Sequence, residues 1–418
     1  MIYVGMDDTD SKQGMCTTYL AAVLAERLER FGVHGYPRLV RLNPNIKYKT
    51  RGNAALCIIL EHGPVDEIER IVVGAVEEYG RFEDENTNPG VVIHEGEVPD
   101  EAKAFALRVV RDVVEIEEAA DIALRHGMRV RRFKNGRGII GALASIGLEM
   151  YDYTYELLAY RMQDCCESPR YLDKESVYEM DAATYPDTWD NVDLRNKVIV
   201  FSPHTPDPVL YGIRGISPGV LLKARDMLRT EPVERYQIFI TNQGTDMHLL
   251  DAKVSEAKND GSYVLKGFVL GEPRTIEGGH VFFSIEQDGA SIECAAFEPT
   301  KNFRETVKKL IKGDEVRVFG SVKGDTMNLE KLEAVRLAVQ FKKVPPKCPE
   351  CGKSMESSGK DKGYRCRKCG TKQASPLYEK VERALEPGLY EVPPSARRHL
   401  AKQIIRIKEP WCPMHPSR

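Results

Sequence analysis

The chain has 418 residues, of which 42% are hydrophobic and 29% are charged, a size and composition that suit three or four domains with buried cores. The net charge of −3 gives no global sign of a nucleic-acid partner, although residues 129–137, 301–317 and 342–372 are locally basic. The N-terminus has no signal-peptide pattern and no apolar run approaches the length of a membrane span, so despite ten cysteines we expect a cytoplasmic protein without a membrane partner.

Residues 1–148 alternate strand and helix patterns, which predicts an α/β or α+β domain. A strand over Ile2 to Gly5 runs into an acidic loop, and helical periodicity follows from Thr17 to Phe31. The remaining expected elements are strands around 39–40 and 54–60, a helix over 65–79, and one or two helices over 101–126.

The acidic loop after the first strand is the strongest enzymatic signal. Asp7, Asp8 and Asp10 lie close together at a strand end, where carboxylates repel one another unless a cation or hydrogen-bond donors neutralise them. Magnesium bound together with a nucleotide phosphate would do so. The alternative is an Asx-type turn with a helix cap, because Asp, Thr and Ser favour both.

Thr17 and Thr18 stand at the start of the next predicted helix, whose free backbone N–H groups could meet a phosphate. A threonine at such a position can cap the helix, contact a phosphate or accept a phosphoryl group. Capping alone is the simpler interpretation.

Two basic loops are further candidates for phosphate contact. One contains Lys49 and Arg51, and a solvated hairpin tip explains it equally well. The other contains Lys134, Gly136, Arg137 and Gly138 and matches G-x-G-x-x-G, but no convincing ribose-binding acid follows it, so a dinucleotide fingerprint is weakly supported. No P-loop motif is present in the chain.

Residues 149–250 predict a ferredoxin-like domain in the order β-α-β-β-α-β. The expected strands are 151–161, 198–201, 209–214 and 236–241, and the expected helices are 174–182 and 218–228.

Residues 258–342 predict an OB-fold, with five short strands and a helix over 303–311 between the third and fourth. A zinc ribbon is expected over 343–375. Residues 376–418 are expected to form a C-terminal tail with a basic helix from Ser395 to Ile407.

The ribbon prediction depends on two Cys-x-x-Cys pairs, Cys348 with Cys351 and Cys366 with Cys369. This spacing lets four thiolates surround one Zn²⁺, and a glycine after each pair allows the chain to turn. Two disulfides or unligated thiols are the alternative. A ribbon in lysine-rich sequence is typical of proteins that handle nucleic acids.

Several of these segments resemble the archaeal isoleucine-tRNA 2-agmatinylcytidine synthetases, and the match runs essentially end to end. The segments that carry it are residues 4–11, 14–20, 42–45, 49–53, 136–141 and 241–246. The resemblance implies a multidomain α+β protein with a kinase-like α/β N-terminal domain over 1–148. It also implies an ATP-dependent ligase that joins agmatine to the 2-carbon of the wobble cytidine in the AUA-reading isoleucine tRNA, yielding AMP and two phosphates.

By the same resemblance, Asp7, Asp8 and Asp10 hold Mg²⁺ and the ATP triphosphate, and Thr18 lies at the phosphoryl-transfer centre, either as a contact or as a phosphorylated residue. Lys134, Gly136, Arg137 and Gly138 would cradle phosphate. The OB-fold and the ribbon would grip the tRNA. A non-catalytic RNA-binding protein and a metal-dependent nuclease remain the alternative functions.

Overall fold

The computed structural model describes residues 1–50, 52–166, 168–360 and 362–418. In this part of the chain, one nine-stranded sheet runs through the first two domains in the order β5-β4-β1-β3-β2-β11-β6-β10-β7. The two halves join where β2 pairs in parallel with β11. The first half is built from β1 (Ile2–Asp7), β2 (Arg38–Arg41), β3 (Ala54–Leu60), β4 (Gly90–Glu95) and β5 (Arg129–Arg132).

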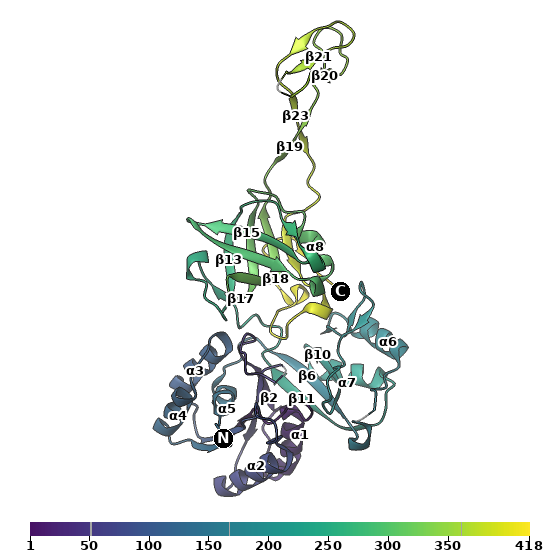
Figure 1. Cartoon of the computed structure of the whole chain (residues 1–418). Helices are drawn as coiled ribbons and strands as arrows, with labels where there is room; N and C mark the ends of the chain where they lie inside the picture. Colours follow the sequence, from purple (N-terminus) through teal and green to yellow (C-terminus); the bar gives the residue numbers. More distant parts are fainter. Residues whose placement is uncertain (51, 167, 361) are drawn as a thin grey trace.

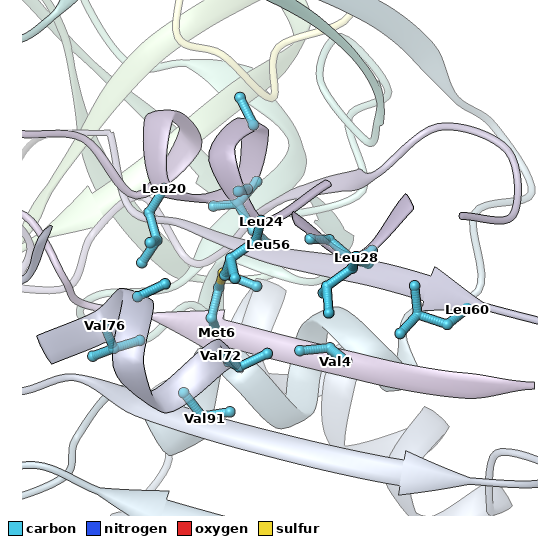
Figure 2. Close-up of a cluster of buried hydrophobic side chains, with 14 of the residues drawn as sticks. Val4, Met6, Leu20, Leu24, Leu28, Leu56, Leu60, Val72, Val76 and Val91 are labelled. Atoms are coloured by element: carbon cyan, nitrogen blue, oxygen red, sulfur yellow. The ribbon is translucent and has the colours of Figure 1, made fainter. Parts of the chain in front are cut away.

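Helices cover both faces of the first half. One apolar layer packs α1 (Thr17–Arg27) and α2 (Val65–Tyr79) against the sheet, and Figure 2 shows Leu20, Leu24, Val72 and Val76 meeting Val4, Met6 and Val91 there. The opposite layer contains α3 (Asp100–Arg111), α4 (Ile116–Arg125) and α5 (Ile139–Gly147). In β1 the side chains alternate between these layers, which is the period of a strand buried on both faces.

The sequence did not predict β4, β5 or α5. Helix α5 follows the glycine-rich loop directly and packs on β1, β3, β4 and α3, so it is part of the first domain's core. Its approach to β1 requires glycine, because an ideal Cβ at Gly5 would lie 2.1 Å from the Ala142 carbonyl oxygen, and one at Gly138 would lie 2.5 Å from that of Asp7.

The second half of the sheet has the strand order β11-β6-β10-β7, which is the 4-1-3-2 order of a ferredoxin-like domain. Its elements are β6 (Thr154–Arg161), α6 (Lys174–Thr184), β7 (Thr188–Trp189), β10 (Val209–Gly215), α7 (Pro218–Met227) and β11 (Val233–Thr241). The prediction of the second strand at 198–201 was wrong. Residues 198–199 form β9, which pairs with β8 (Val192–Asp193) in a separate hairpin, while β7 occupies the sheet edge.

The OB-fold is a closed barrel in which β13 pairs with β15, β15 with β16, β16 with β18, β18 with β17, and β17 with β13. The strands are β13 (Ser262–Val269), β15 (Val281–Gln287), β16 (Ala290–Ala296), β17 (Glu315–Lys323) and β18 (Thr326–Arg336), with α8 (Asn302–Val307) between the third and fourth. Short strands β12 (Leu250–Asp251) and β14 (Arg274–Thr275) add to its edges.

The ribbon projects away from the barrel at the end of a two-stranded stem (Figure 1). The stem pairs β19 (Gln340–Val344) with β23 (Leu377–Val381). The ribbon's own strands are β20 (Glu356–Ser357), β21 (Tyr364–Arg365) and β22 (Lys372–Gln373). With this arm, the predicted fold class of a multidomain α+β protein carrying an OB barrel and a zinc ribbon is confirmed.

The prediction of a C-terminal tail with a basic helix was wrong. Strand β24 (Gly388–Glu391) pairs with β18, β25 (Met414–His415) pairs with β24, and between them residues 393–407 form an extended strap with only two 3-10 turns, 394–396 and 404–406. The basic side chains of the strap contact other domains and do not lie on one face of a helix. Arg397 contacts Asp190 and Lys402 contacts Asp152.

Among the residues that the structure describes, no helix is long and apolar enough to cross a lipid bilayer.

Candidate active site

A cavity of about 1000 Å³ lies where the first domain, the ferredoxin-like domain and the C-terminal strap meet. Of the residues proposed from the sequence, it brings together Asp7, Asp8, Asp10, Thr18, Lys49, Arg137 and Gly138. Arg51 lies outside the described residues. Lys134 and Gly136 are not part of the lining.

Asp7 ends β1 beneath the start of α5. Its Oδ1 accepts a hydrogen bond from the Asp8 amide at 2.7 Å, and an ideal Cβ on Gly141 would lie 2.0 Å from its Oδ2. Burial, together with the carboxylates of Asp8 and Asp10, holds the pKa of Asp7 well above its usual range. Gly141 therefore makes room for the Asp7 carboxyl group at this helix end.

The next residue, Asp8, has a left-handed backbone with φ +62°. The extended strand ends at Asp7, so the side chains of Asp8 and Asp10 do not point the same way as they would in a continuous strand. Its Oδ2 accepts hydrogen bonds from Arg137 Nη2 at 2.8 Å and from the Asn88 amide at 3.2 Å. Burial raises the pKa of Asp8 to about 7, although Arg137 acts against this shift.

Asp10 is buried and accepts a hydrogen bond from Thr50 Oγ1 at 2.8 Å, which ties the acidic loop to the loop containing Lys49. The described residues contain one group of side chains whose ligand atoms converge as in a metal site, and it is the cysteine cluster rather than these aspartates. The acidic loop therefore fits Mg²⁺ held by one or two carboxylates together with substrate phosphates, as is usual for this ion.

Thr18 lies in the first turn of α1, and its side chain is buried at the cavity wall. Cys16 precedes the helix without a side-chain cap, and its Sγ lies 3.0 Å from Thr18 Oγ1. Thr9 Oγ1 donates to Thr17 Oγ1 at 3.1 Å. Capping, the simpler interpretation of these threonines, therefore does not describe Thr18.

The basic residues of the glycine-rich loop have different roles, one inside the cavity and one outside it. Arg137 reaches the cavity through Asp8, and its guanidinium lies 5.5 Å from the ring centre of Tyr48. Lys134 instead donates from Nζ to the backbone carbonyl of Asp84 at 2.6 Å, so it ties down a neighbouring loop. Gly136 turns the chain with φ +72° against the Arg132 side chain. The structure thus does not place Lys134 and Gly136 as parts of a phosphate cradle in this cavity.

Sequence reasoning missed a charged cluster on the ferredoxin-like side. Glu156 of β6 lies 3.3 Å from Arg214 Nε and 3.8 Å from Arg41 Nη2, and Arg214 Nη2 lies 2.7 Å from Nδ1 of His399 on the strap. These residues come from four separate elements. No local motif in the sequence connects them.

The four cysteine Sγ atoms of the ribbon lie within 4.8 Å of one another. Cys348 and Cys366 are buried, and Met355 packs beside them. Four thiols at this separation fit the tetrahedral coordination of Zn²⁺, which binds thiolates at about 2.3 Å. The alternative of two disulfides does not apply, because all four cysteines are free.

The ligand-free protein should lose stability as pH rises through the pKa of Asp8. A carboxyl group whose folded-state pKa is raised stabilises the fold while protonated, and this contribution declines between about pH 4 and about pH 7, by at most about 1.4 kcal/mol per pH unit. The free energy of unfolding of Asp8→Asn, relative to that of the ligand-free wild type, should therefore rise by roughly 2 kcal/mol between pH 5 and pH 8. Thermal unfolding of both proteins at the two pH values checks this, and a constant difference between them would contradict the raised pKa.

Comparisons with known proteins cover nearly the whole chain. Family models match the TiaS TCKD domain at residues 3–68, the TiaS FLD domain at 136–248, the OB-fold nucleic acid binding domain at 263–335 and the TiaS C-terminal zinc ribbon domain at 345–385. The tRNA(Ile2) 2-agmatinylcytidine synthetase TiaS of Archaeoglobus fulgidus is 51% identical over 409 residues, which cover 97% of each chain.

Two solved structures superpose on the chain with similar quality. A TiaS–tRNA(Ile2)–ATP complex has a TM-score of 0.92 at 50% identity, covering 98% of both chains. A TiaS–tRNA(Ile2)–AMPCPP–agmatine complex has a TM-score of 0.89 at 47% identity, again covering 98% of both.

Proposed function

This chain belongs to the tRNA(Ile2) 2-agmatinylcytidine synthetases, and we propose that it uses ATP to attach agmatine to the 2-carbon of the wobble cytidine in the AUA-reading isoleucine tRNA. The observation that carries this proposal is one cavity lined by Asp7, Asp8, Asp10 and Thr18, in a chain that also has an OB barrel and a zinc ribbon. We place the activity in the cytoplasm, where its tRNA substrate is found.

The chemistry requires the 2-carbonyl oxygen of cytidine to become a leaving group. Phosphorylation of that oxygen makes a phosphate ester, and the agmatine amine then forms the new C–N bond at the 2-carbon while the C–O bond breaks and phosphate departs. The amine loses a proton in this step. ATP provides the driving force: one of its phosphoryl groups leaves as the displaced phosphate, and hydrolysis of a second phosphoanhydride bond by one water gives AMP and the other phosphate. The protein positions groups and neutralises charge.

The acidic loop and Thr18 would handle the phosphoryl group. Magnesium, held by one or two of the carboxylates of Asp7, Asp8 and Asp10 together with the triphosphate, would neutralise phosphate charge. Arg137 contacts Asp8 directly and can turn toward a phosphate oxygen when one is present. Thr18 is buried in the first turn of α1, where free backbone N–H groups favour an anion.

The target base must leave its stack to reach this cavity, as with other enzymes that act on a base. None of the described residues of the barrel strands or the ribbon arm lines the cavity, so both would bind the rest of the tRNA, with the zinc stabilising the ribbon fold. The arm projects away from the barrel (Figure 1). The ferredoxin-like domain contributes Glu156 and Arg214 to the cavity, so it would contact substrate as well.

Incubating the zinc-replete protein with ATP, labelled agmatine and the isoleucine tRNA should give labelled tRNA of unchanged length. A nuclease would shorten the RNA, which gel analysis detects. A non-catalytic RNA-binding protein would give no heat on titration with ATP and Mg²⁺. Absence of incorporation by the folded protein would contradict the proposed ligase.

A further inference from the structure

One wall of the cavity collects basic side chains from four parts of the chain. We call it the basic wall, formed by Arg41 of β2, Lys49 of the following loop, Arg214 of β10, and Arg398 and His399 of the C-terminal strap. The strap is fixed in place, because the His399 carbonyl accepts from the Gly244 amide at 2.8 Å and the Leu400 carbonyl from the Asp246 amide at 2.9 Å.

The carboxylates that face the basic wall do not balance its charge. Glu156 serves both Arg41 and Arg214, at 3.8 and 3.3 Å, and Glu330 lies 3.6 Å from Arg398. Asp190 lies 3.7 Å from Arg214 but is also paired with Arg397, and Lys49 Nζ donates to the backbone carbonyl of Pro44.

The cations therefore act on one another. Burial, Arg398 and Lys323 lower the pKa of Lys49, and burial, Arg41, Arg214 and Lys49 hold the pKa of His399 well below its usual range. In the described part of the chain, the buried Nε of Arg41 has no hydrogen-bond partner. Excess positive charge at a half-enclosed site is stabilised by a bound anion.

The hydrogen bond from Arg214 fixes the role of His399. A guanidinium can only donate, so Nδ1 of His399 must accept, and in a neutral imidazole the proton then lies on Nε2. Nε2 has no hydrogen-bond partner among the described residues and lies 3.5 Å from the point that a Cβ on Gly52 would occupy. The same Cβ would lie 2.2 Å from Arg41 Nη1, so a glycine at position 52 keeps this corner open.

We propose that the basic wall binds a phosphate group of the substrates, with Nε2–H of His399 as a neutral donor and Arg41, Lys49 and Arg398 as the cations. The proposal rests on the proposed function, which supplies two phosphate sources, the ATP chain and the tRNA backbone. Both offer the same oxygen chemistry, and separate binding measurements distinguish them. His399 would thus be a substrate-binding residue delivered by a segment that the sequence marks as a tail.

Two substitutions at His399 separate substrate binding from a structural role. His399→Gln keeps an N–H donor near the position of Nε2 but loses the acceptor at Nδ1. His399→Asn keeps an acceptor for Arg214 near Nδ1 but cannot reach the Nε2 position. His399→Ala removes both, and His415→Gln is the matched control, because His415 stacks on Tyr390 at 4.2 Å and does not line the cavity.

ATP affinity with Mg²⁺ is measured by calorimetry without tRNA, and tRNA(Ile2) affinity by filter binding without ATP over a range of salt concentrations. We expect His399→Ala and His399→Asn to weaken one of these affinities about tenfold, as for loss of a hydrogen bond to a charged group, and His399→Gln to restore most of it. If tRNA is the ligand, Arg398→Gln should also lower the slope of log affinity against log salt by about 1.

Rescue by asparagine but not glutamine, or affinities for both substrates within twofold of wild type in all His399 variants, would overturn the proposal. Agmatine incorporation by the wild-type preparation is measured alongside. Its absence would count against the proposed ligase, whereas the two binding measurements judge the basic wall independently.

Discussion

Asp8→Asn is expected to lower ATP turnover at least 100-fold while leaving tRNA affinity within about twofold of wild type. Asparagine has nearly the same shape and can still accept from Arg137 and the Asn88 amide, so the loop should keep its fold. It lacks the negative charge that magnesium and the triphosphate require. Asp8 lies in the cavity, whereas the proposed tRNA-binding surfaces are the OB barrel and the ribbon arm. We therefore expect tRNA binding to persist.

AMP release measures turnover, and filter binding measures tRNA affinity. Asp84→Asn is the matched control, because Asp84 caps a neighbouring exposed loop through the Asn86 amide and does not line the cavity. Loss of tRNA binding with turnover retained would contradict the role assigned to Asp8. In assays well below saturation with ATP, activity of the wild type should also fall as pH drops below about 7, because Asp8 of the ligand-free protein is then protonated and must lose its proton before it binds a cation.

The sequence predicted those elements whose pattern is local. Helix α2 occupies the predicted range 65–79, and β3 occupies the predicted range 54–60, because a clear apolar pattern and flanking turn residues mark both. Helix α5 was missed because Gly136, Gly138 and Gly141 make its start resemble a loop, while the helix itself is buried nearly all round and has no amphipathic stripe. Gly138 and Gly141 serve close packing against Asp7 at the end of β1, whereas Gly136 turns the chain against the Arg132 side chain.

The strap was mispredicted for a different reason. Its basic residues recur at a helix-like spacing, but Pro393 and Pro394 stand at its start and its backbone groups bond to neighbouring domains. Tertiary contacts thus decide its extended form. The same limit applies to the active site: adjacent residues such as Asp7 and Asp8 are visible in sequence, whereas Glu156, Arg214 and His399 meet only in the folded chain.

Cys348→Ser is expected to reduce tRNA modification at least tenfold while leaving the affinity for ATP unchanged. The ribbon's buried cluster consists of little more than Cys348, Met355 and Cys366, so it is too small to fold without the metal. Residues 340–381 contain eleven Lys and Arg against four Asp and Glu, in a chain whose net charge is −3, so the ribbon arm is a strongly basic surface suited to phosphates. Figure 1 shows the ribbon at the end of its stem, on the side of the barrel away from the first two domains.

Zinc content by atomic absorption, ATP affinity by calorimetry and agmatine incorporation are measured on the same preparation. Cys294→Ser is the matched control, because Cys294 is buried in the OB barrel and lies apart from the four-cysteine cluster. Parallel loss of ATP binding and of modification in a folded Cys348→Ser protein would show that the arm is coupled to the catalytic cavity. The separation of the two modules along β19 and β23 argues for the opposite result, in which the arm contributes tRNA affinity alone.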